Sequence, residues 1–241
     1  MGKRVVVSFG LVLFLVLCFS VDSFADPRRY VWTYEYSTPR KGEFEIEDYV
    51  TTKIPDKHKS NINTVQEWLE FEYGITDRWD VAMYQMYKFK NKANENDGKY
   101  DGFKVRTRYR FGEKGKYIVD PLIYLEYIRD PDFSKPNVIE EKLILAKDVG
   151  NFNISYNQIL ERNLDKKGKG NNEYAAGISY TIFRTLKFGI EGKGSFNERE
   201  NFVGPAIGWE KNKFWFSLGA AFGINRRSDD LQTRIIVGYE F

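Results

Sequence analysis

The stretch Phe103-Lys-Val-Arg-Thr-Arg-Tyr-Arg-Phe111 alternates four basic side chains with apolar or hydroxyl-bearing ones. Successive side chains of a β-strand point to opposite faces, so this period of two gives a strand with one basic face and one largely apolar face. A soluble sheet would bury the apolar face in a core. A membrane barrel would turn it to lipid and leave the basic face in the lumen.

The same alternation recurs along the chain and predicts twelve strands, while no stretch has a convincing helical period. Each strand is about as long as the ~9–11 residues that cross a bilayer when tilted. The expected ranges are 42–54, 63–75, 79–90, 101–111, 118–129, 138–148, 151–162, 173–183, 186–196, 201–210, 213–223 and 231–241.

The expected connections alternate in length. Short turns are expected at 76–78, 112–116, around Gly150, at 184–185 and at 211–212, and longer polar loops at 55–62, 91–100, 130–137, 163–172, 197–200 and 225–230. Outer-membrane barrels have short periplasmic turns and long outer loops, whereas a soluble meander has no reason to sort its loops by end. We therefore predict an all-β fold, a transmembrane antiparallel β-barrel of about twelve strands in the outer membrane of a Gram-negative cell envelope.

The first 25 residues have the pattern of a secretory signal peptide. The basic pair Lys3-Arg4 precedes an almost wholly apolar stretch from Val5 to Ser20, and Ser23-Phe-Ala25 supplies the small residues of a cleavage site. An uncleaved membrane anchor is the alternative. The single cysteine, Cys18, lies in this segment, so the exported chain is expected to contain no disulfide.

The charge balance is close to neutral, because 37 Lys and Arg residues stand against 34 Asp and Glu residues. No nucleic-acid partner is therefore expected. One Cys and one His leave almost no material for thiolate or imidazole metal sites, so neither a metal nor a cofactor is expected. The histidine, His58, lies between two lysines in an expected solvated loop. The sequence therefore predicts no catalytic residues and no enzyme.

Aromatic residues gather beside the expected short turns, where a girdle at the membrane–water interface is favoured. They are Trp79, Phe111, Tyr117, Phe152, Phe183, Trp209, Phe214 and Phe241. The alternative is that aromatic residues are simply good strand formers. At the end of the chain, Tyr239 and Phe241 share one face of the last strand. Such a terminal aromatic strand resembles the assembly signal of bacterial outer-membrane proteins, which implies the barrel assembly machinery as a partner.

The apolar face of each expected strand fixes which charges enter the lumen. Those expected there are Lys104, Arg106, Arg108 and Arg110 on one side, with Glu45, Glu47, Glu70 and Glu72 two or three strands away. Two interpretations follow. Separated walls of opposite sign would make a transverse field that orients polar solutes. Alternatively, the charges pair across the lumen and fill it, because an unpaired buried charge is costly.

The eighth to eleventh strands are expected to point small residues inward. These are Gly177, Ser179, Gly189, Gly204, Ala206, Gly208, Ser217 and Gly219. The spare volume could hold water or an inserted segment. We expect three regions: the signal peptide at 1–25, an N-terminal segment at 26–41 that is either periplasmic or inserted in the lumen, and the barrel at 42–241. An extra strand is a further reading of residues 26–38.

Several strand-and-turn motifs resemble small bacterial outer-membrane barrels, a family described as porins or phenol-degradation-pathway outer-membrane proteins. The motifs are Pro39–Glu47, Trp68–Val81, Glu141–Leu145, Val203–Trp209 and Gly238–Phe241. The resemblance implies an outer-membrane barrel with a transport role, and it supplies no catalytic residues. A weaker likeness links the basic row at 104–110 to twelve-stranded channels for acidic oligosaccharides.

The sequence thus favours a porin-like barrel for passive transport of small polar or charged solutes, with outer-membrane lipid around it. The alternative is a non-conducting structural or adhesive barrel that acts through its outer loops. A soluble periplasmic β-protein fits poorly, because Lys, Arg and Glu on the inner face cannot make a dry core.

Overall fold

A computed structural model describes residues 28–92, 95–164 and 170–241 of the chain. The predicted signal peptide, residues 1–25, lies outside the described residues. Among the residues that are described, no helix is long and apolar enough to cross a membrane.

Twelve β-strands make up the described chain, with a short 3-10 helix between the first two. The elements are β1 (Phe44–Ile54), the 3-10 helix (Lys57–Lys59), β2 (Asn63–Thr76), β3 (Trp79–Lys92), β4 (Glu95–Arg110), β5 (Asp120–Arg129), β6 (Val138–Val149), β7 (Phe152–Asn163), β8 (Gly170–Phe183), β9 (Leu186–Ser195), β10 (Asn201–Lys211), β11 (Phe214–Gly223) and β12 (Leu231–Glu240). Most of these bounds lie within a few residues of those predicted from the alternation.

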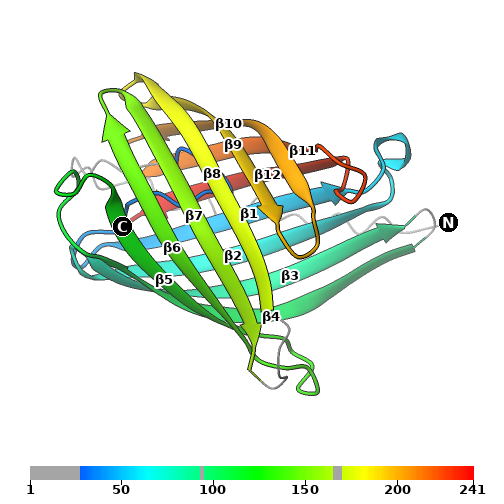
Figure 1. Cartoon of the computed structure of the whole chain (residues 1–241). Helices are drawn as coiled ribbons and strands as arrows, with labels where there is room; N and C mark the ends of the chain where they lie inside the picture. The colour runs from blue at the N-terminus through cyan, green and yellow to red at the C-terminus, as the bar shows by residue number, and fades with distance from the viewer. Residues whose placement is uncertain (1–27, 93–94, 165–169) are drawn as a thin grey trace.

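The strands form one closed antiparallel barrel in which each strand pairs with its neighbour in the sequence. Pairing of β1 with β12, from Glu45 opposite Glu240 to Ile54 opposite Leu231, closes the ring (Figure 1). Closure leaves no strand edge unpaired, which is the condition for a sheet to cross a bilayer. The predicted all-β twelve-stranded barrel is confirmed.

The connections sort by end of the barrel, as the sequence indicated. We call the end with the connections 77–78, 111–119, 150–151, 184–185 and 212–213 the short-turn end, and the opposite end the long-loop end. The connection 111–119 is longer than the expected turn at 112–116. The Asp120 carboxylate orders it by accepting hydrogen bonds from the backbone amides of Gly115, at 2.8 Å, and Tyr117, at 3.3 Å.

The predicted loop at 91–100 is wrong, because β3 and β4 continue through most of it as a long hairpin (Figure 1). Lys90 pairs with Asp97 in the register, and the Lys88 ammonium lies 2.5 Å from the Asp101 carboxylate. The rings of Tyr87 and Tyr100 meet at 5.6 Å. From Lys90 to Lys99 the sequence has no aromatic or large apolar residue, so the alternation that marks the other strands is absent there.

The outer surface of the barrel is apolar. Val105, Ile123 and Leu143 are each more than two-fifths exposed and point away from the lumen, in phase with their neighbours on β4, β5 and β6. At the short-turn end, the rings of Trp79 and Phe152 are exposed. An apolar belt bordered by aromatic rings is the outer surface of a membrane barrel.

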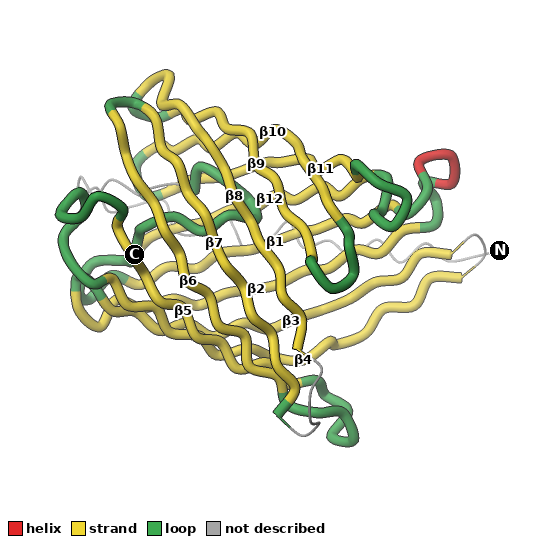
Figure 2. Tube along the Cα trace, in the orientation of Figure 1, coloured by secondary structure: helices red, strands yellow, loops and turns green. Residues whose placement is uncertain are grey.

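The inside of the barrel is not empty, because residues 28–38 pass through it without forming a strand. We call this stretch the lumen segment. Figure 2 shows it as a loop within the ring of strands. Its side chains complete two buried apolar clusters. Val31 and Trp32 join one with Tyr49, and Tyr36 joins the other with Leu122.

Candidate functional site: the filled lumen

The basic row of β4 from Lys104 to Arg110 lies on the inner face of the strand, where β2 and β3 supply carboxylates for its two middle arginines. Arg106 is 1% exposed and donates hydrogen bonds to Glu70 and Glu72 on β2. It also donates to Asp80 on β3 at 2.8 Å. Arg108 donates to Glu72 and, at 2.8 Å, to Asp80. We call this inner surface of β2, β3 and β4 the charged wall.

Asp80 was not among the predicted lumen residues, although the alternation of its strand includes it. Asp80, Ala82 and Tyr84 alternate with Val81 and Met83, so the carboxylate shares a face with the small and aromatic inner residues. It is the second residue of the strand expected at 79–90. In the barrel it faces Arg108 across the β3–β4 ladder.

The two ends of the basic row have separate partners. Lys104 pairs with Glu126 on β5 at 2.9 Å, and its ammonium lies 4.3 Å from the ring centroid of Trp68. Arg110, at the short-turn end, donates to the Thr38 hydroxyl at 2.8 Å and to the backbone carbonyl of Asp77. The charges of these strands therefore pair between neighbours along the wall.

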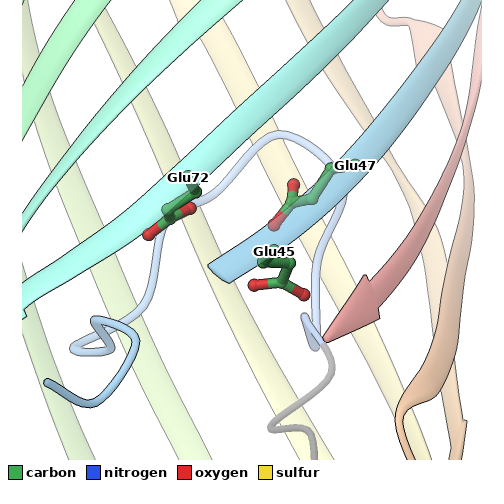
Figure 3. A group of neighbouring side chains, drawn as sticks. All are labelled: Glu45, Glu47 and Glu72. Atoms are coloured by element: carbon green, nitrogen blue, oxygen red, sulfur yellow. The ribbon is translucent and has the colours of Figure 1, made fainter. Parts of the chain in front are cut away.

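Three of the predicted acidic residues form a cluster at the short-turn end. Oxygen atoms of Glu45, Glu47 and Glu72 lie within 4.8 Å of one another, and Figure 3 shows two of them coming from β1 and one from β2. They are the described residues most suited to hold a metal ion. Each carboxylate already accepts a hydrogen bond: Glu45 from the Trp215 indole, Glu47 from the Tyr49 hydroxyl, and Glu72 from two guanidinium groups. These donors account for the cluster.

The opposite side of the lumen, on β8 to β11, lacks bulky side chains where the lumen segment crosses it. A Cβ atom at Gly177 would lie 2.4 Å from the Tyr30 ring, and one at Gly219 would lie 2.4 Å from Val31 Cγ2. A Cβ atom at Gly208 would lie 2.4 Å from the backbone oxygen of Arg28. We call this surface the glycine wall. Any larger residue there would occupy the volume of the segment.

Glu191 on β9 fixes the middle of the lumen segment. Its carboxylate accepts hydrogen bonds from the backbone amides of Val31 at 2.9 Å and of Trp32 and Thr33 at 3.0 Å. The Thr33 hydroxyl donates to the same carboxylate at 3.1 Å. A strand would satisfy such amides with a ladder, so one buried carboxylate replaces the missing backbone partners.

Amide and phenol groups hold the rest of the segment. The Asn157 side chain accepts from the backbone amide of Tyr34 at 2.6 Å and donates to its carbonyl at 2.9 Å. The Tyr30 hydroxyl donates to Asn153, and the Tyr36 hydroxyl donates to the carbonyl of Gly112 at 2.7 Å. Burial raises the pKa of both phenols, so both remain neutral hydrogen-bond donors.

The segment leaves two cavities in the lumen. One, of about 240 Å³, faces the short-turn end and includes Glu45, Glu72 and Arg110 in its lining. We call it the inner vestibule. The other, of about 290 Å³, faces the long-loop end and includes Lys53 and Lys193. We call it the outer chamber. Tyr34 lines both cavities, so the septum between them includes its ring.

The roles of Glu191 and Asn157 left little signal in the sequence. Both share the inner face of their strand with other polar residues, Asn153 and Ser155 on β7 and Lys193 on β9. A polar residue on an inner face indicates a lumen but does not say what it binds. Recognising them required knowing that another part of the chain fills the lumen beside them.

Other predicted functional residues lie outside the lumen. Tyr239 and Phe241 lie together at the end of β12, with ring centroids 5.0 Å apart, and the backbone amide of Phe241 donates to the carbonyl of Phe44 at 2.9 Å. His58 lies on the 3-10 helix at the long-loop end, where its side chain is exposed.

Comparisons with known proteins find the fold but no sequence family. No family model matches the chain, and no curated protein matches its sequence. Among solved structures, KdgM porin aligns with a TM-score of 0.57 and 12% identity, covering 82% of this chain and 99% of its own. KdgM porin in complex with disordered oligogalacturonate gives 0.55 and 9%, covering 83% and 98%. NanC porin gives 0.51 and 11%, covering 82% and 98%. The barrel is thus similar in fold to small outer-membrane porins.

Proposed function

We propose that the protein is an outer-membrane barrel with a porin-like function, passing small polar or charged solutes when the lumen segment moves. The observation that carries this proposal is the pair of cavities that face opposite ends and share the Tyr34 septum. A solute that enters either cavity has to displace this septum in order to cross. The likeness in fold to small porins supports the same function.

The lumen segment is a suitable movable part because of how it is held. The barrel wall is joined by twelve continuous backbone ladders, whereas residues 28–38 have no ladder and depend on side chains such as Glu191 and Asn157. Regions with few backbone hydrogen bonds open at lower free energy than the sheet around them. The segment can therefore leave while the barrel stays folded.

Single-channel recording in a planar bilayer tests this proposal. The full chain, expressed and purified from membranes, should give discrete current steps. Tyr34→Ala, which removes the ring that both cavities share, should raise the conductance or the open fraction several-fold. Tyr87→Ala, which removes an exposed ring of the β3–β4 hairpin, is the matched control and should change neither. Silence from both the unmodified chain and Tyr34→Ala would contradict solute passage.

The filled lumen favours a second candidate, a non-conducting barrel that acts through its long-loop end. Arg106 and Glu70 are almost wholly buried inside the barrel, so the charged wall offers no wide aqueous path. Under this function the long-loop end would bind a partner. Removing the tip of the β3–β4 hairpin, which is part of that end, should then abolish binding and leave the fold intact.

The apolar belt and the likeness in fold to outer-membrane porins support a location in the outer membrane. Kinship with phenol-degradation-pathway outer-membrane proteins is supported by the sequence motifs alone. The terminal aromatic pair serves the barrel assembly machinery, so Phe241→Ala should lower the amount of assembled barrel, measured in membrane fractions. We also propose that the chain is not an enzyme, so His58→Ala should alter neither assembly nor passage.

A further inference from the structure

Three of the cations that line the outer chamber make no ion pair with a described carboxylate. Lys53, Lys193 and Arg234 come from β1, β9 and β12, and all three line the chamber. Across the described residues, no ion pair involves any of them. Other lysines of the same chamber are paired, since Lys104 meets Glu126 at 2.9 Å and Lys142 meets Glu140 at 2.8 Å.

Neutral groups hold two of these cations. The Lys193 ammonium donates to the Gln232 side-chain oxygen at 2.6 Å, and Lys53 lies opposite Gln232 in the β1–β12 register. Arg234 lies two residues along on the same face and donates to the Thr51 hydroxyl at 2.8 Å. Lys193 and Arg234 are therefore held by neutral partners rather than by a carboxylate, which leaves both cations able to bind an anion.

Aromatic rings form one side of the same cluster. The Lys193 ammonium lies 4.8 Å from the ring centroid of Trp32, and the Arg234 guanidinium lies 5.6 Å from it and 5.2 Å from that of Trp68. Trp32 is only 9% exposed, yet its indole N–H has no hydrogen-bond partner. Buried donors are rarely left without an acceptor, so this N–H is a second sign of a missing ligand.

We propose that the outer chamber binds a small organic carboxylate. A carboxylate only accepts hydrogen bonds, which matches a site made of two ammonium groups, a guanidinium and an indole N–H. The Trp32 and Trp68 rings suit a ligand with one flat, less polar face. The cavity of about 290 Å³ lies at the lower end of small-molecule sites, so the ligand is small.

The acidic residues of the chamber limit the charge of this ligand. The lining holds five cations and five carboxylates, so the chamber carries no net charge. Glu173, Glu198 and Glu200 are the carboxylates that make no ion pair among the described residues. They would repel a second carboxylate but accept hydrogen bonds from hydroxyl groups. The site therefore takes a monocarboxylate, with or without hydroxyl groups, in preference to a polyanion.

The inference rests on the proposed function for its role, since it names the class of solute that would cross. Trp32 belongs to the lumen segment, while the cations belong to the wall. A bound carboxylate therefore contacts both the fixed and the movable part of the barrel.

Isothermal titration calorimetry on the purified full-length barrel in detergent tests the site without any requirement for passage. Galacturonate and galactose form one matched pair of probes, and benzoate and benzyl alcohol form another. We expect each carboxylate to bind at least about tenfold more tightly than its neutral counterpart, because only the carboxylate makes charge-assisted hydrogen bonds. Comparison of the two carboxylates shows whether hydroxyl groups or an aromatic ring is favoured.

Two variants and one control locate the binding. The double variant Lys53→Gln, Lys193→Gln should weaken carboxylate binding about tenfold or more, because it removes two of the three cations. Trp32→Phe keeps an aromatic ring but removes the N–H donor, and should weaken binding several-fold. Lys59→Gln, on the exposed 3-10 helix of the long-loop end, should leave binding unchanged. Far-UV circular dichroism checks that each variant keeps the barrel.

Three results would overturn the site. They are equal binding of carboxylates and their neutral counterparts, no binding of either, and unchanged carboxylate binding by the folded Lys53→Gln, Lys193→Gln barrel. These results are independent of current measurements. A barrel that binds carboxylates but never conducts keeps the site and loses the proposed function. A barrel that conducts without binding carboxylates keeps the proposed function and loses the site.

Discussion

The space beside the two walls of the lumen is filled in opposite ways. On the charged wall, long side chains from neighbouring strands fill the space themselves, with Arg106 at the centre of three carboxylates. On the glycine wall, residues such as Gly177 and Gly219 leave space that the lumen segment occupies. The first wall is filled by residues that cannot leave without unfolding the sheet. The second is filled by a stretch of chain without strand pairing.

Because of this difference, the charged wall stabilises the barrel, whereas the lumen segment beside the glycine wall is able to move. A buried ion network resists change because removing one partner leaves the others charged and unpaired. The lumen segment is fixed by hydrogen bonds that involve side chains rather than by a strand ladder, so these bonds can break while the backbone bonds between the strands remain. We therefore expect substitutions on the charged wall to affect the free energy of unfolding of the barrel, and substitutions on the glycine wall to affect the closure of the lumen.

The largest effect is expected from Arg106→Met. It leaves Glu70, Glu72 and Asp80 without their shared cation, and should lower the free energy of unfolding by about 3–5 kcal/mol. Urea unfolding of the barrel in detergent, followed by circular dichroism, measures it. Arg162→Met is the control, because Arg162 makes an exposed pair with Glu141 and should cost less than about 1 kcal/mol. Equal losses of unfolding free energy in both variants would show that the charged wall stabilises the barrel no more than an exposed ion pair does.

An intermediate effect is expected from Gly177→Leu. The new side chain takes the volume of the Tyr30 ring, so the segment should be displaced at a cost of about 1–3 kcal/mol in overpacking. Trypsin should then cut after Arg28 or Arg29, detected by mass spectrometry. Gly192→Leu is the matched control on the same sheet, because a Cβ atom there meets only the Phe202 carbonyl at 3.4 Å. Protection of the segment in Gly177→Leu would show that the fit is looser than described.

The smallest effect is expected from Glu191→Gln, which keeps the size of the side chain and removes its charge. Hydrogen bonds to a charged group contribute about 1.5–3 kcal/mol, and the amide oxygen of glutamine retains part of this. Hydrogen exchange at the amides of Val31, Trp32 and Thr33 should accelerate about tenfold, while the unfolding midpoint stays nearly unchanged. Glu141→Gln, outside the lumen, should change neither quantity. Unaltered exchange in Glu191→Gln would show that other contacts hold the segment.

The sequence predicted the barrel well because its signals are local. Alternation such as that from Phe103 to Phe111 repeats in nearly every strand, and the polarity of the turns marks where each strand ends. It failed at 91–100, where the hairpin has no such alternation. The inward direction of Arg106 and Glu70 also followed from the alternation, since the opposite faces are apolar.

The contents of the lumen could not be predicted in the same way. The pairing of Arg106 with Asp80 depends on the register of the β3–β4 hairpin, which alternation alone does not specify. The inner glycines indicated spare volume, but volume alone does not distinguish water from a segment of chain. Glu191 takes its role from the backbone amides of residues 31–33, about 160 positions earlier in the chain.

Whether the lumen segment closes a passage is tested most directly by tying it to the wall. A Cβ atom at Gly219 would lie 2.4 Å from Val31 Cγ2, so cysteines at these two positions are close enough for a disulfide. The full chain carrying Val31→Cys and Gly219→Cys, with Cys18→Ser to remove the remaining thiol, is recorded in a planar bilayer before and after reduction. We expect a silent barrel with the disulfide intact and discrete current steps once it is reduced. The same current in both states, or silence in both, would contradict a passage that the segment closes.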